Sequence, residues 1–210
     1  MSEIVVDGLG VRLKEVRQQN GLSLRELARR AQVSPSFISQ IENGKSQPSV
    51  SSLYTLARLL GISIDQLFDE QEPAPGAPPE TQSVSPVSAW HPSEYANRIS
   101  VVHPSHRSVL EMADGVVWER LAATPEHAVN FMKISYAPGA TSSEEGGLQS
   151  HEGYEYGYVL RGVVEVVVGS ESFTLHEGES LGFDSNIPHV LRNIGDDVFE
   201  GVWFVHGRRH

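Results

Sequence analysis

A proline-rich stretch, Gln71 to Ser88, divides this chain into two segments whose apolar residues follow different periods. The stretch contains five prolines and no aromatic residue. Prolines hold a segment extended, so this composition predicts a linker that leaves the orientation of its neighbours free. Apolar residues recur at helical spacing before it and alternate as in strands after it. We therefore expect a helical domain over residues 1–70, the linker over residues 71–88 and a β-rich domain over residues 89–210.

Five short helices are predicted before the linker from their start and stop signals. Ser23 and Glu26 form a capping box, and Ser34 precedes Pro35, which suits the first position of a helix because the N–H it lacks would be unpaired there. Glycines that suit left-handed C-caps close three of the helices: Gly21, Gly44 and Gly61. The connection between the second and third helices is short, which is typical of a helix-turn-helix.

The two segments differ in charge. Residues 10–60 carry eight Lys and Arg residues against three acids, a local charge of +5, whereas residues 71–210 carry eight against 19, a charge of −11. A basic surface is what attracts nucleic acid. This asymmetry indicates that the helical domain, and not the β-rich one, binds DNA.

The segment from Leu9 to Phe68 resembles the Xre and phage-repressor class of helix-turn-helix domains. The resemblance is carried by GLSLRELA at 21–28, VSPSFISQIENGK at 33–45 and Pro48. It implies a five-helix, all-α domain whose third helix lies in the major groove of double-stranded DNA. A helical bundle without DNA binding is the alternative, and the local positive charge disfavours it.

The outward face of the third helix supplies the predicted DNA contacts. Gln40 is the strongest candidate for reading a base, because an amide can bond adenine N6 and N7 together. Ser36 can add a hydrogen bond, while Pro35 and Phe37 can offer only apolar contact. Phosphates would be held by Ser34, Asn43 and Lys45. The predicted set is Ser34, Pro35, Ser36, Phe37, Ser39, Gln40, Asn43 and Lys45.

Other positions of the domain are expected to be structural. Ile38 and Ile41 face inward on spacing, and the resemblance implies that Arg17 pairs with Glu42 inside the fold. Leu24 stands where many relatives carry a phosphate-binding glutamine. One contact to the DNA backbone is therefore expected to be missing.

Short β-rich runs fill the chain after the linker, with a core over about residues 115–206. Gly169-Ser170 joins two runs as a tight hairpin, and Gly162 separates two others. Six to eight such strands in this length predict a sandwich or a small barrel. Most aromatic residues on these strands are expected in the core, with one or two on a pocket wall: Tyr154, Tyr156, Tyr158, Phe183, Trp203 and Phe204.

Two motifs in this segment resemble those of the cupin superfamily, an all-β jelly roll. The first is His151-Glu-Gly-Tyr-Glu155 followed by Gly162, and the second is Gly178 followed by Pro188-His189 and Asn193. A cupin after an Xre domain is similar to the Xre-cupin regulators, which sense amines, amino acids and other small metabolites. The resemblance implies four side chains facing the barrel interior: Gln149, His151, Glu155 and His189.

Gln149 replaces the first histidine of the cupin ligand set, which leaves two interpretations. In one, the four side chains hold a divalent metal, for which Zn, Mn, Fe and Ni are all suitable. In the other, His151, Glu155 and His189 form a metal-free polar pocket. Glu155 would favour a cationic effector without metal and an anionic one with it. The effector is accordingly expected to be an amine, an amino acid or a carboxylate.

We expect a cytoplasmic transcription regulator, most simply a ligand-responsive repressor that binds a palindromic operator as a homodimer. The chain has no secretory signal pattern, no apolar run long enough to span a membrane and no cysteine, so thiolate chemistry is excluded. The alternative is a metal-dependent cupin enzyme of the oxygenase or epoxidase type with an accessory helix-turn-helix. We expect no catalysis, since Gln149 weakens a metal site and no separate general base accompanies it.

Overall fold

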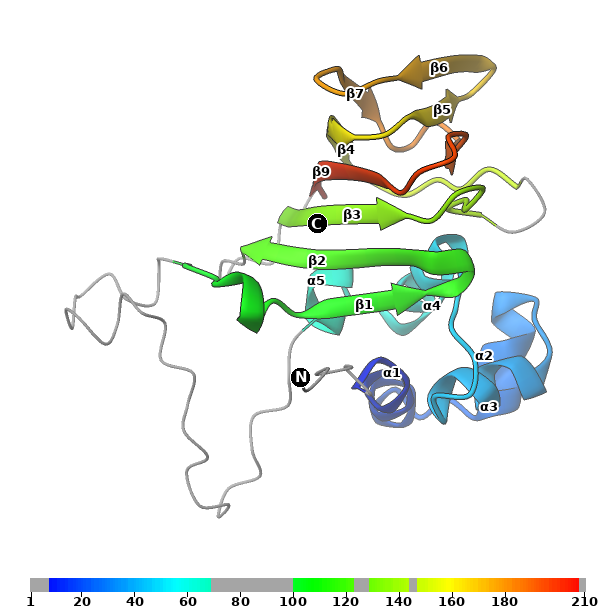
Figure 1. The fold of residues 1–210 in the computed structure, drawn as a ribbon. Coiled ribbons are helices and arrows are strands. Elements are labelled where there is room, and N and C mark those ends of the chain that lie inside the picture. The colour runs from blue at the N-terminus through cyan, green and yellow to red at the C-terminus, as the bar shows by residue number, and fades with distance from the viewer. Residues whose placement is uncertain (1–7, 69–99, 123–128, 144–146, 208–210) are drawn as a thin grey trace.

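The computed structural model describes residues 8–68, 100–122, 129–143 and 147–207, and Figure 1 shows them as a helical domain beside a β-sandwich. This is the predicted pairing of an all-α domain with an all-β jelly roll. The predicted linker, residues 71–88, lies outside the described residues. None of the described helices combines the length and the apolar character that crossing a membrane requires.

Local capping signals define the helices of the first domain. The helices are α1 Gly8–Gln19, α2 Leu24–Ala31, α3 Pro35–Glu42, α4 Val50–Leu60 and α5 Ile64–Leu67. The hydroxyl of Ser23 accepts from the N–H of Glu26, and the hydroxyl of Ser34 accepts from that of Phe37. Gly61 adopts the left-handed conformation, φ +70°, that ends α4. The predicted starts of α2 and α3 and the end of α4 are confirmed.

A buried ion pair joins α1 to α3 within an apolar core. Arg17 Nε and Nη2 donate to the two carboxylate oxygens of Glu42 at 2.6 and 2.8 Å, and Nη1 donates to the carbonyl of Leu22 at 2.8 Å. The hydrogen bond to Glu42 raises the pKa of Arg17 above its ordinary value, and burial, which lowers that pKa, only partly opposes it. The pairing implied by the family resemblance is therefore confirmed, as is the inward placement of Ile38 and Ile41.

The second domain is a sandwich of two antiparallel sheets. The larger has the order β1-β2-β3-β9-β4-β7, and the smaller has the order β6-β5-β8. The strands are β1 Val109–Met112, β2 Val116–Ala122, β3 Val129–Tyr136, β4 Tyr154–Arg161, β5 Val164–Val168, β6 Glu171–Leu175, β7 Ser180–Asp184, β8 His189–Asn193 and β9 Phe199–His206. Short 3-10 turns cover Pro104–His106 and Ala113–Gly115.

The described chain thus holds nine strands where six to eight were expected. The first strand, Val109–Met112, lies before the predicted core and pairs antiparallel with β2. The predicted turns are confirmed: Gly169, φ +61°, lies between β5 and β6, and Gly162, φ +81°, lies between β4 and β5. A Cβ at Gly162 would crowd the backbone of Phe199, so this turn suits glycine on two grounds.

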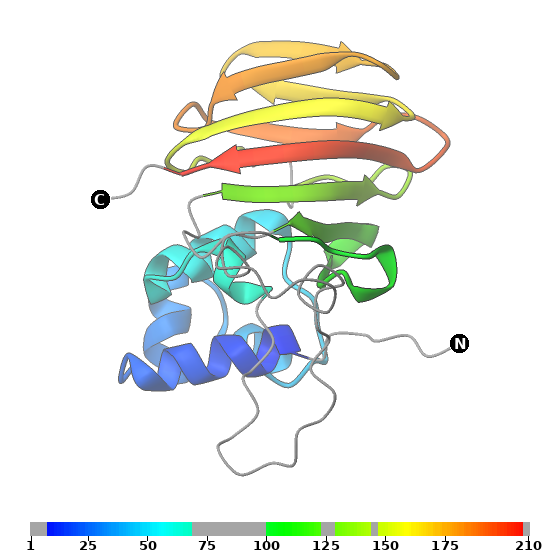
Figure 2. The ribbon, with the colours of Figure 1, turned by 90° about the vertical axis from the view of Figure 1, so that its left-hand side faces the viewer.

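The helical domain packs directly on the sandwich. Figures 1 and 2 show α4 and α5 next to the larger sheet, with α2 and α3 on the side away from it. The N–H of Ser51 donates to the carbonyl of Ser142 at 3.1 Å, and the N–H of Ala113 donates to that of Pro48 at 3.1 Å. One apolar core runs through both domains. These contacts give the two domains a defined mutual orientation.

Candidate functional site

The third helix, α3, presents most of the predicted DNA contacts to solvent. Ser34, Pro35, Ser36 and Gln40 are exposed, and so are Asn43 and Lys45 just beyond the helix. The opposite face is buried through Ile38 and Ile41, each 2% exposed. The side-chain amide of Asn43 donates to the carbonyl of Ser39 at 2.7 Å and so ties down the end of the helix. A polar, exposed helix with a buried apolar back is the arrangement that a groove-reading helix requires.

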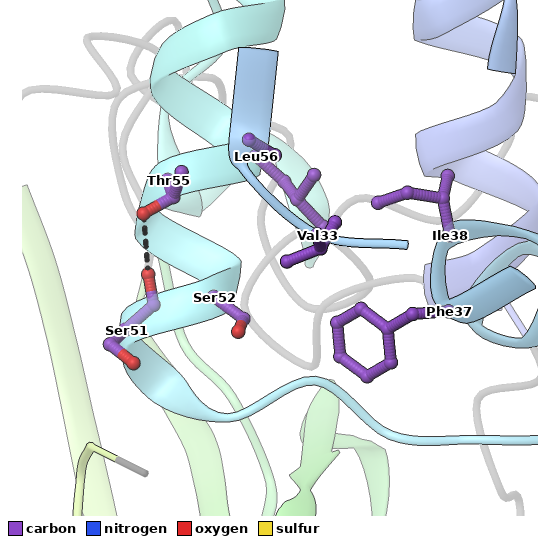
Figure 3. Close-up of a pocket in the computed structure, with 8 residues that line it drawn as sticks. Val33, Phe37, Ile38, Ser51, Ser52, Thr55 and Leu56 are labelled. Carbon is purple, nitrogen blue, oxygen red and sulfur yellow. Dashed lines mark hydrogen bonds between the residues drawn. The ribbon is translucent and has the colours of Figure 1, made fainter. Parts of the chain in front are cut away.

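Phe37 differs from the prediction. It is half-buried and lines a pocket of about 100 Å³ between α3 and α4, beside Val33, Ile38 and Leu56 (Figure 3). The N-terminal turn of α4 closes the same pocket with Ser51, Ser52 and Thr55. The ring therefore packs towards the domain interior, because burial of its apolar area outweighs exposure to water. The expectation that Phe37 faces outward is therefore met only in part, as it is for Ser39, which is also half-exposed, and contact of either residue with DNA stays a prediction.

Backbone pairing brings the predicted barrel residues together. Gln149 pairs with His189 at the start of β8, where each N–H donates to the other's carbonyl at 2.9 and 2.8 Å. The N–H of His151 donates to the carbonyl of Ser185 at 3.0 Å. Glu155 follows on β4, with its side chain turned into the sandwich and 4% exposed.

The side chains of three of these residues converge on one point. His151 Nε2 lies 2.7 Å from Glu155 Oε1, and His189 Nε2 lies 3.1 Å from the same oxygen. The other carboxylate oxygen, Oε2, accepts from the indole N–H of Trp203 at 2.7 Å. One ligand atom from each of the three residues lies within 4.8 Å of the other two. The indole thus fixes the carboxylate with one oxygen turned to both imidazoles.

The electrostatics of this cluster keep the carboxylate of Glu155 charged. Burial raises the pKa of Glu155, but His151 and His189 outweigh burial and hold that pKa well below its ordinary value. Burial lowers the pKa of His189, and the carboxylate of Glu155 more than compensates and raises it. Burial and then the charge of Glu155 raise the pKa of the Tyr54 and Tyr136 hydroxyls. The cavity therefore holds a carboxylate among neutral phenols.

The donor atoms fit a divalent metal. Within the described chain, His151 Nε2, His189 Nε2 and Gln149 Oε1 are buried and make no aligned hydrogen bond. His189 Nδ1 lies 2.9 Å from the carbonyl of Ile187, which suits an N–H on that nitrogen and leaves the Nε2 lone pair free. Two imidazoles, a carboxylate and an amide oxygen are a set that Zn, Mn, Fe or Ni accepts. The residues present can therefore hold such an ion.

A residue of the helical domain completes this site. The ring of Tyr54, on α4, stacks on the ring of His151 with 4.1 Å between centroids and 4° between planes, and it meets Trp118 edge-on at 6.0 Å. The cavity that remains is about 20 Å³ and is lined by Tyr54, Gln149, Glu155 and residues of both sheets. Tyr54 was not among the sequence-predicted site residues, because nothing in its local pattern reveals a contact with a different domain.

The aromatic residues of the strands divide between two faces. Trp203 is 2% exposed and lines the cavity, and the ring of Phe183 lies 4.9 Å from that of His189. Tyr156 and Tyr158 are instead 54% and 47% exposed on the outer face of β4. The expectation that most of the six aromatic residues lie in the core is therefore wrong, because only Trp203 among them is buried. Strand alternation turns Tyr156 and Tyr158 away from Glu155, which lies on the inner face.

Comparisons with known proteins match both domains. The helix-turn-helix family model matches residues 13–67, and the cupin domain model matches residues 132–205. The chain is 30% identical to the HTH-type transcriptional regulator PuuR of Escherichia coli K12 over 88% of this chain and 86% of that protein. It is 27% identical to the HTH-type transcriptional regulator SutR of the same organism over 94% of each. A solved HTH_3 family transcriptional regulator from Vibrio cholerae, 21% identical, covers 96% of both chains with a TM-score of 0.62, which shows the common fold.

Proposed function

Because the chain belongs to the helix-turn-helix transcriptional regulators that carry a C-terminal cupin domain, we propose that it is a ligand-responsive repressor acting as a homodimer on a palindromic operator. The proposal of DNA binding rests on α3, which exposes its polar face to solvent and buries its apolar face in the domain core. Two such helices about 34 Å apart read half-sites one turn of DNA apart, so the protein would act as a dimer.

We expect Gln40→Ala to weaken sequence discrimination by about 1–3 kcal/mol, which is about 5- to 150-fold in relative affinity, because a bidentate amide contact to adenine is lost. The measurement is a gel shift on an operator selected from random DNA, at fixed salt. Gln18→Ala, at an exposed glutamine of α1, is the matched control. Unchanged operator affinity and preference in Gln40→Ala would show that another residue reads the base.

The barrel would hold the effector, with Gln149, His151, Glu155 and His189 as its polar anchors. A divalent metal bound by these four side chains would supply a Lewis acid that attracts an anionic effector, such as a carboxylate. Without metal, the carboxylate of Glu155 would attract an amine or the amino group of an amino acid. The convergence of His151 Nε2 and His189 Nε2 on one oxygen of Glu155 supports the metal-bound form of the proposal.

The dimer would form through the outer face of the larger sheet. Tyr156, Tyr158 and Leu160 are 54%, 47% and 41% exposed there. The two tyrosines, with Val202 and Phe204, line a hollow of about 490 Å³. Apolar patches on soluble proteins mark interfaces. A second copy of this chain is the partner that a two-fold operator demands.

Tyr158→Glu is expected to convert the dimer to a monomer and to lower operator affinity at least tenfold, because it places a charge in an apolar interface. Light scattering after gel filtration measures the mass, and the gel shift measures binding. Glu152→Gln, at an exposed site before β4, serves as control. A variant that remains dimeric would place the interface elsewhere.

A metal-dependent enzyme is the second candidate, favoured by the two histidines and one carboxylate that converge in the barrel. That set is also found in non-haem Fe(II) oxygenases. Consumption of oxygen by the Fe(II)-loaded protein with small carboxylates would support it. A discrete operator footprint, with no such consumption, supports the regulator.

A further inference from the structure

The DNA-reading domain itself closes the mouth of the barrel. Tyr54 projects from α4 and stacks on His151, and Val50 of the same helix lines the cavity with it. The rim of the contact is polar: the Ser51 N–H reaches the Ser142 carbonyl, and the Gln47 amide lies 3.4 Å from Glu111. The reader and the barrel therefore meet at the cavity entrance.

Tyr54 lies beside the fully buried stripe of its own helix. The buried face of α4 is formed by Leu53, Leu56, Ala57 and Leu60, each at most 4% exposed. Tyr54 lies one residue beyond Leu53, which turns it about 100° around the helix and out of that stripe. Its ring contacts are instead with Trp118 of β2 and with His151. The Tyr54 side chain therefore packs against the barrel.

The closed cavity is too small for a metabolite. Its volume is about 20 Å³, which is enough for one water molecule. Pockets that hold small organic ligands measure about 300–1,000 Å³. An effector of that size fits beside Glu155 only if the cavity widens, and Tyr54 lines that cavity from the helical domain.

We propose that Tyr54 is the gate of the effector site, so that the effector and the docked DNA-reading domain compete for the mouth of the barrel. The inference rests on the proposed function, in that it takes the barrel as the effector site. A ligand that enters binds only the open state, and it therefore shifts the equilibrium towards release of α4. The signal would pass from the barrel to the helical domain through α4, which carries Tyr54.

Release of α4 changes what the dimer presents to DNA. In the closed state the exposed face of α3 is held in one orientation relative to the sandwich, so two readers in a dimer have a fixed spacing. In the open state each helical domain is joined to its barrel only by the covalent chain, so the spacing of the two α3 helices is no longer fixed. The affinity gained by binding two half-sites at once then decreases. The effector is thus expected to weaken operator binding.

Acylation of histidines by diethyl pyrocarbonate tests the gate without a known effector or operator. The full-length protein is labelled in the presence of EDTA, and modification of each histidine is followed by peptide mass spectrometry. His176, whose side chain is 65% exposed, is the internal reference, and His151, 12% exposed beneath Tyr54, is the reporter. His189, fully buried against Glu155, reports whether the reagent reaches the side chains behind His151.

Tyr54→Ala is expected to raise the labelling rate of His151 relative to His176 at least tenfold, and that of His189 as well. Tyr54→Phe keeps the ring and should stay within about twofold of the wild type, since stacking needs no hydroxyl. Tyr156→Ala, at an exposed tyrosine outside the mouth, should also leave the rate unchanged. Unaltered protection of both histidines in Tyr54→Ala would overturn the gate.

A cross-link gives a second measurement that keeps Tyr54 in place. The chain has no cysteine, so Gln47→Cys with Glu111→Cys supplies a single pair that a short bismaleimide can join across the rim. The cross-linked protein should label His151 at least fivefold more slowly than the same variant left unjoined. Equal rates would mean that reagents enter without separation of the domains, which also overturns the proposal. Neither labelling experiment involves DNA. Failure of the proposed function would therefore appear in the gel shift, and failure of the gate in the labelling rates.

Discussion

Glu42→Ala is expected to destabilise the helical domain by about 3–5 kcal/mol, because it leaves the guanidinium of Arg17 buried without its partner. The pair is bidentate, with N to O distances of 2.6 and 2.8 Å, and both residues are under 10% exposed. Urea unfolding followed by circular dichroism at a helix-sensitive wavelength measures the loss. DNA binding should fall with it, since α3 is one of the two helices that the pair joins.

The exposed ion pairs of α2 provide the matched control. Glu26 binds Arg29 and Arg30 at the surface, so Glu26→Ala should change stability by less than about 1 kcal/mol. Replacing both buried partners, Arg17→Met with Glu42→Leu, should recover most of the stability, because no uncompensated charge remains. A Glu42→Ala protein as stable as the wild type would show that water reaches Arg17 in solution.

Glu155→Gln is expected to lower the affinity for Zn²⁺ by more than about 100-fold, since loss of even a supporting partner of a metal ligand costs 10- to 100-fold. Glu155 Oε1 is the oxygen on which both imidazoles converge, and the substitution removes its charge with little change of shape. Competition with a chromophoric chelator measures the affinity. Gln149→His should act in the opposite direction and raise the affinity about tenfold, because imidazole binds these metals more strongly than an amide.

Glu179→Gln is the control for this series, because Glu179 also faces a histidine, His176, but on the exposed surface. It should leave metal affinity unchanged. Wild-type protein that binds less than about 0.1 equivalent of any transition metal, with no thermal shift on adding Zn, Mn, Fe or Ni, would exclude the metal site. The cluster would then be a metal-free pocket, and an amine would be the favoured effector.

The helical domain could be predicted closely because its signals are local. Ser23, Ser34 and Gly61 each determine a helix end through contacts within a few residues, and the structure has those ends where the sequence places them. The fold of the second domain could be predicted from its motifs, but not every strand. The strand at Val109–Met112 is too short for alternation to stand out, and its partner strand supplies its hydrogen bonds.

The functional residues show the same division between local and distant interactions. The convergence of His151, Glu155 and His189 was predictable from motif spacing within one domain. Phe37 was predicted only in part, because helical spacing leaves it at the border of the buried face, and the space beside α4 decides its direction. Tyr54 could not be predicted, since its ring partners, Trp118 and His151, lie far away in sequence and in the other domain.

The order of strands in the larger sheet has a consequence for synthesis of the protein. β9, which follows every other described strand along the chain, lies between β3 and β4 at the centre of the sheet. Chains emerge from the ribosome at about 5–20 residues per second, and domains near the N-terminus fold first. The helical domain can therefore fold, and meet DNA, several seconds before the sandwich closes. For that interval each new chain has a folded helical domain but no complete cupin domain.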